Sequence, residues 1–178
     1  RLLHNAILGS EYVRAVLEID RPRVGLLTIG TEEGKGTEMI REAQALFRRC
    51  GSLINYTGPI EGFQLFENAV DVCVTDGFTG NVLLKGLESV FKMIVDFTRD
   101  ELKANPLRMG GAFLAQGAFK AIKADIDPSR YSGAPLLGVR GMVIKTHGSS
   151  DRTYISNAIR IGAEAIEHDL SQHIREDM

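Results

Sequence analysis

Two hydrophobic periodicities alternate along this chain. Apolar residues three and four positions apart predict helices over residues 3–17, 37–47, 82–102 and 150–174, with Thr37 and Ser150 as the N-caps of the second and the last. Short apolar runs rich in β-branched residues predict strands over residues 24–29, 52–57 and 70–75, with shorter ones near 136 and 142–146. Strands and helices that alternate at this length favour a mainly parallel sheet with right-handed crossovers. The pattern therefore predicts an α/β fold.

The predicted helix after residue 81 is long for a domain of this size. Its apolar stripe contains Leu83, Leu87, Val90, Ile94 and Phe97, and Leu84, Phe91 and Val95 widen it. At 1.5 Å per residue the helix spans about 35 Å, so we expect part of it to project from the sheet. The commonest partner for such a helix is its own copy in a second subunit, which predicts a homodimer. The alternative is a helix that crosses the floor of a larger domain.

Residues 106–115 follow this helix and combine apolar side chains and glycines with basic neighbours. An apolar segment beside lysines and arginines suits a transient contact with a membrane surface. The candidate membrane-tip residues are Leu107, Met109, Phe113 and Leu114. Burial in the dimer explains the same residues equally well. We expect residues 82–125 to form a projecting helical segment for dimerisation and membrane contact.

The composition narrows the class of protein. The 178 residues are 44% hydrophobic and 25% charged, as in ordinary globular domains, and the net charge of −2 argues against nucleic-acid binding. The two cysteines, Cys50 and Cys73, match no metal-site or disulfide pattern, which favours a reducing cytoplasm. Because no apolar run is long enough to span a bilayer, we expect a soluble or peripheral membrane protein.

Three loops follow predicted strands, at residues 30–36, 76–81 and 147–150. In doubly wound sheets such strand ends converge on one crevice. The loop 76–81 joins a strand directly to the long helix; its glycines allow close approach, Thr79 can cap the helix, and the helix start suits an anion. A tight turn with a good cap is the alternative. The candidate binding residues are Gly30, Gly34, Gly36, Asp76, Gly77, Thr79, Gly80, Ser149 and Ser150.

The other two loops contain the charged candidates. The loop 30–36 is neither a dinucleotide fingerprint nor a Walker loop, so no nucleotide cofactor is predicted. Lys35 offers a point charge to a phosphate, or is a solvated loop lysine. His147 is an acid, a phosphate ligand or a partner in helix capping. Four scattered histidines show no metal-ligand spacing, and no Ser-His-Asp arrangement is present.

Five segments together resemble the bacterial phosphate acyltransferase family, the fatty acid/phospholipid synthesis protein PlsX. They are residues 21–27 (RPRVGLL), 30–36 (GTEEGKG), 76–85 (DGFTGNVLLK), 133–138 (GAPLLG) and 144–151 (IKTHGSSD). They occur in the family's order and cover nearly all of the chain. Thr28 stands where the family has asparagine, and Ser132 where it has glycine. Because family members are longer at the N-terminus, the chain is expected to be the C-terminal portion of one α/β acyltransferase domain.

The resemblance implies a three-layer α/β/α, Rossmann-like fold of the isocitrate/isopropylmalate dehydrogenase-like superfold. It implies transfer of a fatty acyl group from acyl carrier protein (ACP) to inorganic phosphate, without a cofactor or metal. The acyl phosphate product then passes to an acyl-phosphate:glycerol-3-phosphate acyltransferase. Lys35 and Asn81 match catalytic positions of the family, and His147 is a weaker candidate. The alternatives are a phosphate acetyltransferase-like enzyme of the same superfold, and a non-catalytic fragment for dimerisation and docking.

Overall fold

The chain folds into two compact units in the computed structural model, which describes residues 1–32, 34–126, 133–139, 141–146, 148 and 150–167, with the backbone alone for 123–126. The first unit comprises Arg1–Thr75 and Ser132–Met178, and the second comprises Asp76–Tyr131. The predicted sheet lies in the first unit, and the predicted long helix lies in the second.

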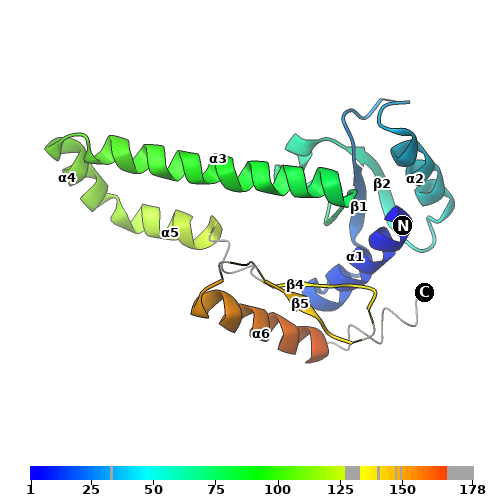
Figure 1. Ribbon diagram of the computed structural model, residues 1–178. Coiled ribbons are helices and arrows are strands. Elements are labelled where there is room, and N and C mark those ends of the chain that lie inside the picture. Colours follow the sequence, from blue (N-terminus) through cyan, green and yellow to red (C-terminus); the bar gives the residue numbers. More distant parts are fainter. Residues whose placement is uncertain (33, 127–132, 140, 147, 149, 168–178) are drawn as a thin grey trace. The chain divides into compact units, whose positions relative to one another are not determined.

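A parallel three-stranded sheet forms the centre of the first unit (Figure 1). Strand β1 (Arg23–Leu27) lies between β2 (Asn55–Ile60) and β3 (Val72–Val74), and pairs with both in parallel. Helices α1 (Leu2–Leu17) and α2 (Glu38–Arg49) share one hydrophobic cluster with these strands. Because the sheet is parallel and flanked by helices, the predicted Rossmann-like α/β fold class is confirmed.

The core explains why the first unit's helices form where they do. Val24 and Leu26 of β1 and Phe47 of α2 have no exposed surface. The Phe47 ring contacts the Tyr56 ring edge-on, with their centroids 5.1 Å apart, a favoured aromatic geometry. Thr37 caps α2 as predicted, because its hydroxyl oxygen accepts a hydrogen bond from the Ile40 N–H.

Strand β2 begins three residues later than predicted. The chain first makes a tight turn after α2, in which the N–H groups of Leu53 and Ile54 both donate to the Cys50 carbonyl. These donors are therefore unavailable to the sheet, and pairing with β1 starts only at Asn55. A short 3₁₀ helix η1 (Gly62–Phe66) then leads toward β3.

The remaining described elements of the first unit are two short strands and a helix. Strands β4 (Ala134–Pro135) and β5 (Ile144–Lys145) pair antiparallel, and α6 (Arg152–Glu167) follows. Gly133, at a φ of 112°, approaches α6 so closely that an added Cβ would lie 2.8 Å from the Ala158 Cα. The predicted cap at Ser150 is wrong by one residue, because the Asp151 carboxylate accepts the N–H groups at the helix start.

The second unit consists of three helices. The 27-residue α3 (Gly77–Lys103) confirms the predicted long helix and begins earlier than residue 82. Asn105 caps the next helix, α4 (Pro106–Leu114), by accepting a hydrogen bond from the Arg108 N–H. Helix α5 (Gln116–Ile126) then runs back along the direction of α3 (Figure 1). No residue of α3 or α4 is buried in this chain.

An ion pair joins β1 to the start of β3. The Arg23 guanidinium donates to both carboxylate oxygens of Asp71, over 3.0 and 2.9 Å, and the Arg23 backbone N–H donates over 2.7 Å. These bonds from the Arg23 side chain, and then from its backbone, hold the pKa of Asp71 below its ordinary value. The pair fixes the amino ends of two neighbouring strands in register.

The substitution Asp71→Asn is expected to lower the free energy of unfolding by about 1–2 kcal/mol at neutral pH, because the charge-assisted bonds are lost. A depressed carboxylate pKa contributes stability above about pH 4, and this contribution disappears as the pH falls through the folded-state value. Wild-type stability should therefore decline more steeply than that of the variant in acid, as measured by urea unfolding between pH 2 and 7.

Asp96→Asn provides the control, because Asp96 forms an exposed ion pair with Arg99 within α3. Its unfolding free energy should stay within about 0.5 kcal/mol of wild type. Equal effects of the two substitutions would contradict the assigned role of Asp71.

Candidate functional site at the carboxyl edge of the sheet

Two of the three predicted loops leave the sheet at the same edge. Strands β1 and β3 are parallel neighbours, so their carboxyl ends lie side by side. The chain leaves β1 at Leu27 and enters the glycine-rich loop, and it leaves β3 at Val74, two residues before Asp76. This edge is where open α/β sheets bind ligands.

The loop after β1 folds its charged side chains over a glycine. Gly30 is buried, and a Cβ added to it would lie 2.5 Å from a Glu32 carboxylate oxygen and 3.4 Å from the Lys35 Cγ. Gly34 and Gly36 adopt φ angles of 84° and 91°, which other residues rarely reach. Glycine at 30 and 36 leaves room for neighbouring side chains, and glycine at 34 and 36 permits the positive φ angles of this loop.

Lys35 is exposed, and among the described residues its ammonium has no hydrogen-bond or ion-pair partner. Its aliphatic stem rests against Gly30, which places the charge at the rim of the loop. An exposed ammonium beside glycine backbone suits an anion such as phosphate, and the Glu32 carboxylate over Gly30 is the negative charge that such an anion meets there.

At the start of α3, Asp76 rather than Thr79 is the cap. One Asp76 carboxylate oxygen accepts the N–H groups of Phe78 and Thr79 over 3.0 and 2.9 Å, and the other accepts the Thr79 hydroxyl over 2.6 Å. The hydrogen bond from the Thr79 hydroxyl contributes most to lowering the pKa of the Asp76 carboxyl, and the bonds from the two N–H groups contribute less. The expectation that Thr79 caps the helix is therefore wrong, because a carboxylate satisfies two backbone donors that a hydroxyl one turn later cannot reach.

This cap changes what the helix start offers to an anion. The Gly80 N–H donates to the Asp76 carbonyl over 2.9 Å, so three successive amides are already bonded to Asp76. The negative charge of Asp76 also occupies the positive end of the helix. Gly77 and Asn81 lie in the same turn, and both are exposed. The Asn81 amide is therefore the polar group of this turn that faces solvent without serving the cap.

The other candidates divide between the units or lie outside the description. Lys35 belongs to the first unit, and Asn81 belongs to the second. His147 and Ser149 lie outside the described residues, whereas Ser150 is half-buried just before α6. Leu107, Met109, Phe113 and Leu114 are all exposed on α4.

Among the described residues, no cluster of three histidine, cysteine, aspartate or glutamate residues could hold a metal ion. Burial raises the pKa of the Cys73 thiol, which keeps it protonated and a poor nucleophile. No helix within the described ranges is long and apolar enough to cross a membrane.

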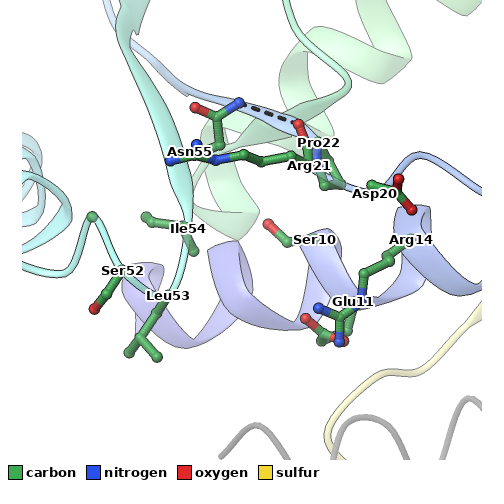
Figure 2. Close-up of a pocket in the computed structure, with 11 residues that line it drawn as sticks. Ser10, Glu11, Arg14, Asp20, Arg21, Pro22, Ser52, Leu53, Ile54 and Asn55 are labelled. Carbon is green, nitrogen blue, oxygen red and sulfur yellow. Dashed lines mark hydrogen bonds and ion pairs between the residues drawn. The ribbon is translucent and has the colours of Figure 1, made fainter.

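Sequence patterns did not reveal a cavity of about 240 Å³ at the opposite edge, where β1 and β2 begin (Figure 2). Glu11 and Arg14 of α1 line it as an ion pair, and the Asn55 side chain donates to the Arg21 carbonyl beside them. None of the predicted site residues lines this cavity. Its one sequence signal is Glu11 itself, which follows Leu3 and Ile7 at four-residue spacing and is buried.

Sequence patterns also missed two buried hydroxyl groups. The Oγ1 of Thr28 and the phenolic oxygen of Tyr56 are closed off from solvent and have no hydrogen-bond partner among the described residues. Burial raises the pKa of the Tyr56 phenol. No periodicity marks either atom, because its lack of a partner depends on the three-dimensional surroundings.

A parallel sheet with glycine-bearing loops at its carboxyl edge defines a Rossmann-like α/β protein whose ligand positions are its strand ends. Residues 1–173 match the family described as "Fatty acid synthesis protein", and the chain belongs to that family. It is 42% identical over 172 residues to a phosphate acyltransferase of Acidobacterium capsulatum, covering 97% of this chain and 50% of the relative.

Two further relatives carry the same name. The Elusimicrobium minutum phosphate acyltransferase is 43% identical over 179 residues, covering 98% of this chain and 52% of the relative. The Methylococcus capsulatus protein is 43% identical over 173 residues, covering 97% and 50%. The chain thus spans about half the length of the curated relatives it matches, and corresponds to their C-terminal part.

Proposed function

We propose that the full-length protein transfers a fatty acyl group from ACP to inorganic phosphate, giving acyl phosphate for phosphatidic acid synthesis. The relatives' name, phosphate acyltransferase, supports a phosphate acceptor. The observation that carries the proposal for this chain is Lys35 at the carboxyl edge of the sheet: its stem lies against Gly30, and its ammonium has no partner within the described ranges. Transfer from the carrier protein is the reaction implied by the sequence motifs.

The proposed reaction needs no covalent enzyme intermediate. A phosphate oxygen attacks the thioester carbonyl, the carbonyl oxygen gains negative charge, and the C–S bond then breaks to release the ACP thiolate. The protein must therefore hold the phosphate, orient it and stabilise the developing oxyanion. Lys35 is the proposed phosphate cation, and Gly30, Gly34 and Gly36 admit the anion to the backbone of the loop.

The Asp76 cap decides between two places for the phosphate. The first amides of α3 are bonded to Asp76, and its carboxylate repels an anion there. We therefore assign the phosphate to the Lys35 loop and the thioester oxygen to the Asn81 amide. In this assignment Asp76, Gly77, Thr79 and Gly80 hold the turn that presents Asn81. His147 is proposed to protonate the departing thiolate. Ser149 and Ser150, in the same loop as His147, are proposed to bind substrate.

Lys35→Ala and Asn81→Ala in the full-length protein should each reduce phosphate-dependent release of ACP by at least about a hundredfold, because each removes an electrostatic contact to the reacting groups. Release is measured by thiol titration with acyl-ACP and phosphate, and folding by circular dichroism.

Arg160→Ala is the control, since it removes an exposed positive charge on α6 that pairs with Glu164. It should retain wild-type turnover. Wild-type turnover in both Lys35→Ala and Asn81→Ala would contradict the proposed site.

The second unit is proposed to provide the remaining contacts. The side chains of Leu107 and Leu114 on α4 are 87% and 86% exposed, and Arg108 lies between them in sequence. We assign these residues, with Met109 and Phe113, to transient contact with a membrane surface. The exposed apolar side chains of α3 are assigned to a homodimer. An acyl-phosphate:glycerol-3-phosphate acyltransferase is the proposed consumer of the product.

Leu114→Glu should abolish flotation of the full-length protein with vesicles of phosphatidylglycerol and phosphatidylethanolamine, because a carboxylate disfavours insertion beside anionic lipid. Ile159→Glu is the matched control, since Ile159 is 69% exposed on α6, outside α4. Flotation is measured after density-gradient centrifugation. Equal flotation of Leu114→Glu and wild type would refute membrane contact by α4.

A further inference from the structure

Thr28 carries a buried hydroxyl that no other described residue of the chain binds. It directly follows β1, and its backbone N–H continues the pairing with β2 by donating to the Ile60 carbonyl over 2.8 Å. Its Oγ1 is closed off from solvent and has no hydrogen-bond partner within the described part of the chain. Buried polar atoms in native proteins nearly always have partners, so an unpaired hydroxyl at a strand end calls for an explanation.

The hydroxyl lies beneath the loop that carries Lys35. A Cβ added to Gly36 would come within 3.0 Å of the Thr28 Oγ1 and 2.9 Å of the Ile40 Cγ2. Gly36 therefore lies directly against the hydroxyl, on the side where a side chain would otherwise stand, and Lys35 is the adjacent residue. Gly34 and Gly36 flank that lysine. Their positive φ angles give the loop a backbone conformation that other residues rarely adopt.

We propose that the Thr28 hydroxyl contacts the substrate phosphate, donating a hydrogen bond to an oxygen of the phosphate that Lys35 attracts. This inference rests on the proposed function. The Thr28 hydroxyl lies at the end of the central strand, beside the glycine-bearing loop. It can donate a hydrogen bond to an anion that enters this loop. The oxygen is shielded from water, so its bond to the charged phosphate replaces no strong bond to solvent. Thr28 thereby contributes to phosphate affinity rather than to the stability of the unliganded fold.

The test compares three variants of the full-length protein. Thr28→Val keeps the branched shape of the side chain and removes the hydroxyl, whereas Thr28→Ser keeps the hydroxyl. Tyr56→Phe is the matched control, because it removes the other unpartnered buried hydroxyl, on β2 at the residue paired with Val24. Turnover is measured against phosphate and against acyl-ACP, and the thermal midpoint is measured with and without inorganic phosphate.

Thr28→Val is expected to raise the KM for phosphate about ten- to a hundredfold, the range that a hydrogen bond to a charged group is worth. Its KM for acyl-ACP should stay within about twofold, as is typical when the contact is to phosphate alone. Its thermal midpoint without phosphate should equal or exceed that of wild type, and the increase that phosphate produces should be lost. Thr28→Ser and Tyr56→Phe should both keep the wild-type KM for phosphate.

Two results would overturn the inference. An unchanged KM for phosphate in Thr28→Val shows that the hydroxyl does not contact it. A lower thermal midpoint of this variant without phosphate shows that the hydroxyl already has a structural partner. Lys35→Ala separates this inference from the proposed function: if it turns over like wild type, the phosphate site itself is misplaced. If Lys35→Ala is inactive while Thr28→Val behaves like wild type, only the role of Thr28 is wrong.

Discussion

The burial of β1 between two parallel neighbours is the constraint on which the rest of the first unit depends. Val24 and Leu26 are fully buried where α1 and α2 pack on the sheet. Parallel pairing on both sides places the carboxyl ends of the three strands at one edge. The pair between Arg23 and Asp71 fixes the opposite end of the same strands. The loop with Lys35 therefore emerges at the edge where parallel sheets bind ligands.

The proposed anion site is the loop after β1 rather than the start of α3. The start of a helix ordinarily attracts anions, but here Asp76 supplies the negative charge and takes up the first amides of α3. In the loop after β1, the Lys35 ammonium and the Thr28 hydroxyl have no partner among the described residues, and the Glu32 carboxylate and the Lys35 stem both lie against Gly30. The proposed phosphate site is therefore the loop with Lys35, and the Asn81 amide is proposed to serve the thioester oxygen.

Sequence patterns predicted the elements that depend on periodicity and on short-range capping. Short apolar runs predicted β1 and β3, and apolar residues three and four positions apart predicted α3. Burial of a strand or of one helix face produces these patterns directly. The choice of Asp76 over Thr79 as cap was missed, since both residues suit a cap and the choice depends on backbone geometry. The buried Glu11 and the unpaired Thr28 hydroxyl were missed because each depends on contacts between segments distant in sequence. Lys35, Asn81 and His147 remain predictions from motifs.

In the proposed reaction phosphate, rather than water or an enzyme side chain, accepts the acyl group. The direct measurement is ³¹P NMR of the full-length protein incubated with acyl-ACP and inorganic phosphate, alongside titration of the ACP thiol. Transfer to phosphate predicts an acyl phosphate resonance that grows in step with the released thiol and requires phosphate. Thiol release at the same rate without phosphate, or release with no new phosphorus signal, would contradict it.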